Sequence, residues 1–361
     1  MILYAHPYQC FRGDQIMKEK VLVVCPGRGT YNKEELGYLG RYHSGKSTMI
    51  DVIEEHRAKK KQTPVVQLDE MTQFSLKKHT AGENASALIY ACALGDFYDI
   101  DRERYDVVAV TGNSMGWYIA LRCAGVLSDT NAINLINTMG SMMQNGIIGG
   151  QVIYPVVDEN WQFDEAKANH LNQVVKEIKD RQGCELYLSI DLGGYRVLGG
   201  NEPALKLVEE MLERVDDRFP MRLYNHAAFH TPLLHKISET AKQILPTSLF
   251  KPSSVALIDG KGKLWQPNCY DVEELYEYTL GPQVIEPYYF GRSIEIAVKE
   301  YAPDKIIITG PGSNLGGSVA QKLVQMKWDG MVDKKSFLKR QESAPYILSM
   351  GREEERAIVV R

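Results

Sequence analysis

The segment over residues 106–127, DVVAVTGNSMGWYIALRCAGVL, constrains this chain more than any other. A run of valines leads into GNSMG at 112–116, and a helical pattern follows without a break. This is the G-x-S-x-G pattern between a strand and a helix, which presents a serine hydroxyl on a strained turn. Its two glycines let strand and helix approach closely, because neither carries a Cβ atom. The pattern predicts Ser114 as a nucleophile; the alternative is a tight turn whose serine only caps the helix.

Three further apolar runs, at 20–29, 255–259 and 305–310, resemble buried parallel strands that end in glycine or proline. Together with the strand before Ser114 they indicate an α/β fold. Ligands of such folds bind beyond the carboxyl ends of the strands. The loop at 26–30, PGRGT, is therefore a candidate site wall that can donate a backbone N–H to an oxyanion hole.

Composition limits the class of protein and of partner. With 361 residues, 44% of them hydrophobic and 24% charged, the chain has the profile of a globular protein with one large domain and a smaller one. A net charge of −4 argues against nucleic acid or an anionic membrane as the main partner. The six cysteines form no CxxC pair and no stretch is long enough to span a bilayer, so we expect a cytoplasmic protein with reduced thiols.

Residues 40–47, GRYHSGKS, match the phosphate-binding pattern G-x-x-x-x-G-K-[ST] letter by letter. Such a loop must follow a buried strand and open a helix. Here the preceding residues, KEELGYL, lack a β-branched run. We therefore predict a surface helix or loop at this place, and nucleotide binding through Lys46 is the remote alternative.

The middle of the chain changes character. Short strand-like runs alternate with two amphipathic helices over 150–215 in the order β-α-β-β-α, which suggests an inserted ferredoxin-like subdomain. The predicted division is an N-terminal extension over 1–19, a core over 20–149 and 216–335, the subdomain over 150–215 and a C-terminal extension over 336–361.

His230 is the best candidate for a general base, because it lies between an apolar run and a helix that opens with proline. His226 and His235 are its rivals, and a structural histidine is the alternative role. The three do not make a zinc motif, since their spacing differs from H-E-x-x-H and no acidic residue lies among them. We expect no metal and no tightly bound cofactor.

Several blocks, in order along residues 20–325, together resemble the malonyl-CoA:acyl-carrier-protein transacylase family, which includes the acyltransferase domains of polyketide synthases. No single motif is specific to this family, but the combination of motifs in this order is. The blocks are CPGRGT, GNSMG followed by AGVL, NTMGSMMQ, LSIDLGGYRVLGG, AFHTPLL, QVIEP and TGPG.

The resemblance implies an α/β-hydrolase-like core with a ferredoxin-like subdomain, and acyl transfer by a serine–histidine dyad. Ser114 would attack the thioester of an acyl-CoA substrate, and His230 would take its proton. The backbone carbonyl of Gln283 would orient the imidazole. The N–H groups of Arg28 and Met115 would form the oxyanion hole. The acyl group would then pass to the phosphopantetheine thiol of an acyl carrier protein.

The chain departs from the family in its expected acyl pocket. Met139 stands where the family has the arginine that holds a malonyl carboxylate, and Asn113 replaces the histidine before the nucleophile. Ser189 and Asp191 replace an Asn-x-Asn pair. A buried carboxylate without a charged partner costs several kcal/mol, so we expect a neutral acyl group such as acetyl. Arg28 is the one nearby cation that would compensate.

Three alternatives remain open from the sequence. Asp191 or Asp259 would act as a triad acid in place of the Gln283 carbonyl. The same dyad would serve a hydrolase that releases acyl groups from CoA or carrier protein to water. A non-catalytic interaction protein would have kept only the fold.

Overall fold

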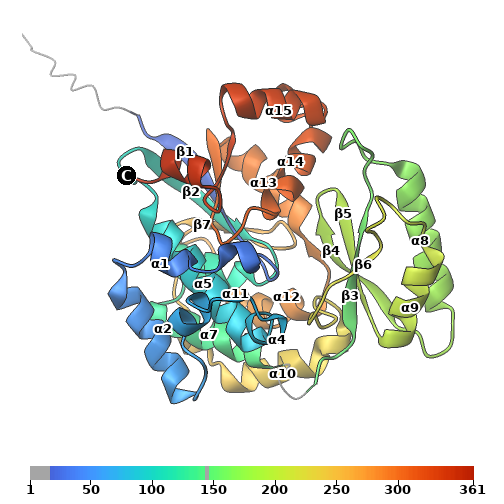
Figure 1. Ribbon diagram of the computed structural model, residues 1–361, viewed down its shortest axis with the longest axis horizontal. Coiled ribbons are helices and arrows are strands. Elements are labelled where there is room, and N and C mark those ends of the chain that lie inside the picture. Colours follow the sequence, from blue (N-terminus) through green and yellow to red (C-terminus); the bar gives the residue numbers. More distant parts are fainter. Residues whose placement is uncertain (1–16, 143–145) are drawn as a thin grey trace, which may run out of the picture.

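The four predicted apolar strands lie side by side in one six-stranded sheet of order β11-β10-β1-β2-β7-β8 in the computed structural model, which describes residues 17–142 and 146–361 (Figure 1). All neighbours in it run parallel except β7 and β8. The Ser114 loop therefore leaves the carboxyl end of β2 beside the loop that leaves β1. The strands are β1 (Glu19–Cys25), β2 (Tyr105–Gly112), β7 (Ala256–Ile258), β8 (Leu264–Trp265), β10 (Lys305–Ile308) and β11 (Ile347–Ser349).

Helices cover this sheet in packed groups. The helix after Ser114, α6 (Gly116–Cys123), and α13 (Phe290–Tyr301) pack directly on β1 and β2. The nearly all-buried α5 (Gly82–Asp99) packs on α6 and α7 (Asp129–Ser141). No helix within the described residues is long and apolar enough to cross a membrane. The other helices of this lobe are α1 (Tyr38–Tyr42), α2 (Ser47–Lys59), α3 (Val65–Asp69), α4 (Leu76–His79), α10 (His235–Ile244), α11 (Val272–Leu280), α12 (Pro282–Ile285), α14 (Leu315–Gln325), α15 (Lys334–Ser343) and α16 (Glu353–Val359).

A second sheet of order β6-β3-β5-β4-β9 makes the smaller lobe, at the right of Figure 1. Its strands are antiparallel except for β9, which joins β4 from the core part of the chain. Two helices with a separate apolar core pack on it. The elements are β3 (Gly150–Pro155), α8 (Glu165–Lys179), β4 (Leu186–Leu192), β5 (Tyr195–Gly200), α9 (Glu202–Met211), β6 (Met221–Arg222) and β9 (Tyr288–Tyr289).

Two predicted boundaries differ from the structure. The small lobe continues past residue 215, because β6 pairs with β3. The expected C-terminal extension over 336–361 is part of the core, since β11 adds a parallel edge strand to β10. Of the predicted N-terminal extension, residues 1–16 lie outside the described residues, and Glu19 already begins β1.

Candidate active site

The Ser114 turn needs both of its flanking glycines. A Cβ at Gly112 would lie 2.2 Å from the backbone of Gly116, and one at Gly116 would lie 2.3 Å from the carbonyl oxygen of Cys25. Ser114 itself has φ +55°, a left-handed conformation that L residues rarely adopt. The strain is concentrated at the one residue whose hydroxyl must be lifted clear of the sheet.

The structure brings Ser114, His230 and Gln283 together. Ser114 Oγ lies 2.7 Å from His230 Nε2, and His230 Nδ1 lies 2.6 Å from the backbone oxygen of Gln283. A carbonyl oxygen only accepts, so Nδ1 carries the proton and Nε2 offers its lone pair to the serine hydroxyl. This is the tautomer that a general base requires.

Burial keeps this imidazole neutral. His230 is 3% exposed, and burial lowers its pKa to about 4, although the Gln283 carbonyl acts in the opposite direction. At neutral pH the ring is therefore ready to accept a proton.

Side chains that the sequence did not single out hold the turn in place. Gln283 Nε2 donates to the Ser114 carbonyl at 3.1 Å, and the Tyr118 hydroxyl donates to Gln283 Oε1 at 2.8 Å. The Tyr288 hydroxyl donates to the Gly112 carbonyl at 2.5 Å, and its ring lies beside His230. Only the position of Tyr118, one helical turn after Ser114, hints at such a role in the sequence.

The predicted oxyanion donors, Arg28 and Met115, both line the cavity that holds Ser114. Within the described residues, neither backbone N–H donates a hydrogen bond to another group. Buried N–H groups are normally paired, so two free ones in the wall of the cavity that holds Ser114 suit an incoming oxygen.

The cavity has a volume of about 260 Å³ and a wall that is mostly apolar. Met139, on α7, and Asn113 both line this cavity. The apolar lining residues are Ile136, Ile153, Ile190, Leu192, Val197, Leu223, Phe229, Leu234, Ile237 and Val284.

Ser189 does not line the cavity, contrary to the prediction. It lies at an irregularity of β4 where the register against β5 shifts, and it has no paired partner there. Its hydroxyl donates to the Phe229 carbonyl at 2.7 Å and accepts from Gln151 Nε2 at 2.7 Å. Ser189 thus supports the loop that carries His230 from behind.

His226 is not the base. Its Nδ1 lies 2.9 Å from Gln151 Oε1. The ring lines the cavity but is bound to Gln151 rather than to Ser114. Burial and the charge of Arg28 lower its pKa to about 3. The third candidate, His235, lies on the surface and contacts Glu239.

Neither proposed triad acid reaches His230. Ile190 and Leu192 face the cavity, so Asp191 between them faces away, because side chains alternate along a strand. It pairs with Arg196 at 2.6 Å instead. Asp259 accepts from Trp265 Nε1 at 3.0 Å and from the amides of a turn. The Gln283 carbonyl occupies the position beside the imidazole where a triad carboxylate would lie.

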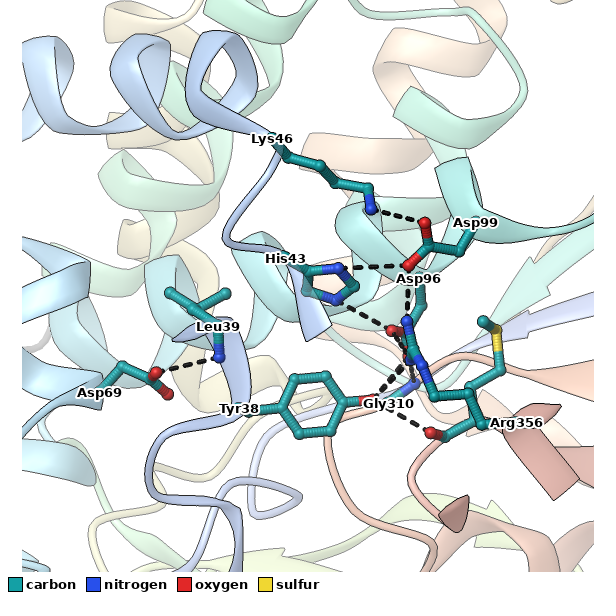
Figure 2. A network of polar contacts seen from close by, with 10 residues as sticks. Tyr38, Leu39, His43, Lys46, Asp69, Asp96, Asp99, Gly310 and Arg356 are labelled. Atoms are coloured by element: carbon teal, nitrogen blue, oxygen red, sulfur yellow. Dashed lines mark hydrogen bonds and ion pairs between the residues drawn. The ribbon is translucent and has the colours of Figure 1, made fainter. Parts of the chain in front are cut away.

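A network of ion pairs joins two segments to which the sequence assigned no function, residues 40–47 and 336–361 (Figure 2). Lys46 of the phosphate-loop pattern lies 2.5 Å from Asp99, and α1 rather than a strand precedes it. Arg356, from the C-terminal α16, pairs with both Asp96 and Asp99. The pattern at 40–47 is therefore structural, and residues 336–361 are anchored in the core.

His43, Asp96 and Asp99 bring three possible metal ligands together. The imidazole nitrogens lie 3.0 and 3.3 Å from the two carboxylates, in ion-pair contact rather than in aligned hydrogen bonds. Burial alone would lower the pKa of His43, but the carboxylates raise it above its usual value. Since Arg356 and Lys46 already neutralise the pair, the cluster fits internal ion pairs better than a metal ion.

The network also fixes one wall of the site. Asp96 Oδ2 accepts from the Gly310 amide at 2.6 Å and from the Tyr38 hydroxyl at 2.8 Å. Gly310 begins the loop after β10, whose Asn314 lines the cavity. The same loop packs on the loop of Arg28, because a Cβ at Gly312 would lie 2.5 Å from the Thr30 carbonyl oxygen.

The chain is similar in part of its sequence and in its fold to known acyltransferases. The malonyl CoA-acyl carrier protein transacylase of Bacillus subtilis (strain 168) is 24% identical over 208 residues, which are 58% of this chain and 62% of that relative, less than two thirds of its length. The malonyl-CoA:ACP transacylase of Synechocystis sp. PCC 6803 superposes with a TM-score of 0.71 at 16% identity, over 95% of this chain and 100% of the other. A malonyl-transacylase solved in complex with a type II polyketide synthase acyl-carrier protein superposes with a TM-score of 0.69 at 15% identity, over 95% of this chain and 99% of the other. No protein-family model matches the chain.

Proposed function

Since the resemblance to the malonyl-CoA:acyl-carrier-protein transacylase and polyketide synthase acyltransferase family is confirmed, we propose that this chain moves an acyl group from acyl-CoA to the phosphopantetheine thiol of an acyl carrier protein. The observation that carries the proposal is the 2.7 Å contact between Ser114 Oγ and a neutral, oriented His230 in the wall of a cavity. The carrier protein as partner is supported by the related transacylase that was solved with one.

The reaction has two matching halves. His230 Nε2 takes the hydroxyl proton as Ser114 Oγ attacks the thioester carbonyl, and the oxyanion is held by the N–H groups of Arg28 and Met115. The C–S bond then breaks, and the imidazolium returns its proton to the departing CoA sulfur. A carrier thiol repeats these steps in reverse on the acyl-serine. Loss of one oxyanion donor of this kind typically costs ~100–1000-fold in rate.

The role of Gln283 is orientation without charge. Its carbonyl accepts the Nδ1 proton of His230 at 2.6 Å, whereas a triad carboxylate would also stabilise the imidazolium electrostatically. Its side-chain amide donates to the Ser114 carbonyl as well. One residue therefore fixes both members of the dyad.

The finer assignments are supported as follows. The mainly parallel order of the large sheet and the βαββαβ order of the small lobe support an α/β-hydrolase-like core with a ferredoxin-like subdomain. Met139 lies in the cavity wall and carries no charge, which by itself favours a neutral acyl group such as acetyl. Arg28 brings a charge to the same wall from another loop.

The test is the intact mass of the protein after exposure to a panel of acyl-CoAs, followed by addition of a phosphopantetheinylated carrier protein. Wild type should gain one acyl mass and lose it to the carrier. Ser114→Ala should gain none, and Ser343→Ala, which removes an exposed serine on α15, should behave as wild type.

Two outcomes contradict the proposal. Release of the acyl group at the same rate with and without carrier protein would assign a hydrolase. An equal mass gain in Ser114→Ala would exclude Ser114 as the nucleophile.

A further inference from the structure

The side chain of Arg28 is built into the acyl cavity rather than pointing to solvent. Its Nη2 donates to the Thr80 carbonyl at 2.8 Å and to the Asn225 carbonyl at 3.1 Å. These acceptors come from the end of α4 and from the loop that leads to His230. The guanidinium also lies over the ring of Phe229, 5.7 Å from its centroid. Two separate segments, the end of α4 and the loop before His230, therefore hold it in the cavity wall.

This buried cation has no anion beside it. Within the described residues, no carboxylate lies within 4.0 Å of the guanidinium, and no aspartate or glutamate lines the cavity. Arg28 Nε is buried without a hydrogen-bond partner, and no described group accepts from Nη1. Burial lowers the pKa of Arg28 to about 10, with only a partial opposing effect from Glu83. An uncompensated buried charge of this kind costs several kcal/mol.

Arg28 is also the only charged side chain among the described lining residues. His226 is neutral at physiological pH, and Met139 offers a thioether. Asn113 contributes a neutral amide whose Oδ1 is buried without a partner. Any preference of this cavity for a charged acyl group must therefore come from Arg28.

We propose that the guanidinium of Arg28 determines acyl specificity by receiving an acyl group that ends in a carboxylate, a role that the resembled family gives to an arginine at the position of Met139. The inference rests on the proposed acyl transfer at Ser114. Nη1 is the guanidinium nitrogen whose N–H groups no described residue accepts, and a charged N–H donor of this kind forms a strong hydrogen bond with a carboxylate oxygen. In the proposed mechanism the backbone N–H of the same residue binds the thioester oxygen, so short dicarboxylic acyl groups such as malonyl or succinyl fit best. This replaces the preference for neutral groups that Met139 alone suggests.

The experiment compares single-turnover acylation of the full chain by malonyl-CoA, succinyl-CoA, acetyl-CoA and butyryl-CoA, read by intact mass. Hydrogen bonds to a charged group contribute about 1.5–3 kcal/mol, so wild type should favour malonyl over acetyl by about tenfold or more. Arg28→Gln should lower this ratio by about the same factor, and Arg28→Lys should lie between, since it keeps the charge but loses the planar group that the Thr80 and Asn225 carbonyls hold in place. Arg28→Gln combined with Met139→Arg should recover it. Arg181→Gln removes an exposed arginine of the small lobe and should leave the ratio unchanged.

The outcomes separate the two proposals. A wild type that prefers acetyl, or a malonyl-to-acetyl ratio that Arg28→Gln does not move, overturns the role of Arg28 while acyl transfer stands. No adduct from any of the four substrates overturns both. If Arg28→Gln does not fold, the wild-type ratio and Arg28→Lys still decide.

Discussion

Replacing Gly116 by alanine tests whether the Ser114 turn depends on close backbone approach. The added Cβ would lie 2.3 Å from the Cys25 carbonyl oxygen and 2.8 Å from that of Pro26, and both contacts are with backbone that cannot rotate away. The end of β1 must move, which endangers the hydrogen bond from the Asn113 amide to Cys25, now 3.0 Å long. Overpacking of about 1–3 kcal/mol and a lost hydrogen bond of about 0.5–1.5 kcal/mol predict a free energy of unfolding lower by about 1.5–4.5 kcal/mol.

The same displacement reaches the chemistry, because Pro26 leads into the loop of Arg28. We expect acylation of Ser114 to fall by at least the ~100-fold that follows loss of one oxyanion donor. Denaturant unfolding and single-turnover acylation measure the two effects. The control is Gly317→Ala in α14, where a Cβ meets nothing within 4 Å and where we expect a gain of up to about 1 kcal/mol. Wild-type stability and rate in Gly116→Ala would refute the packing explanation of the turn.

Four further predictions concern the buried charges. The rate constant kcat/KM for acylation should be flat at neutral pH and fall in acid with an apparent pKa near 4, because His230 must be neutral; a limb at pH 6.5 or above would contradict this. The free energy of unfolding should also decrease as the pH falls from about 6.5 toward 4, because His230 and His226 bind protons in the unfolded chain but stay neutral in the folded one. His43 acts in the opposite sense, because its pKa is raised in the folded chain. Arg356→Met should lower the free energy of unfolding by about 3–5 kcal/mol in denaturant titrations, because it leaves the Asp96 carboxylate buried with one cation fewer; a loss under about 1 kcal/mol would show the network to be dispensable. Lys46→Ala should lower the free energy of unfolding by about 1 kcal/mol or less. Calorimetry with ATP should detect no binding to wild type or to this variant, and ATP binding that Lys46→Ala abolishes would support nucleotide binding through Lys46.

The central strand, the turn and the helix around Ser114 follow from the sequence, because each depends on neighbouring residues. Glycines at fixed offsets, a β-branched run and an uninterrupted helical pattern are local signals. His230 and the Gln283 carbonyl were expected from resemblance rather than from local pattern. Their juxtaposition with Ser114 depends on packing across more than 100 residues of chain.

Other features escaped prediction because no local pattern encodes them. The irregularity in β4 turns Ser189 out of the strand alternation, and a shift of one residue changes the face of every later side chain. The edge strand β11 is three residues long within a charged segment, so composition hid it. Asp96 and Arg356 lie 260 residues apart in sequence. The direction of the Arg28 side chain is set by two backbone carbonyls from distant loops.

The most direct test of the account is to locate the acyl group on the chain and follow its departure. Trypsin should release residues 105–122 as one peptide, which carries Ser114. After exposure to acyl-CoA, fragment masses should place the acyl group on Ser114, in His230→Ala only at a far lower rate, and the label should disappear when a phosphopantetheine thiol on a carrier protein is added. An acyl group found on another residue, or one that forms at an undiminished rate without His230, would contradict the dyad on which the proposed function depends.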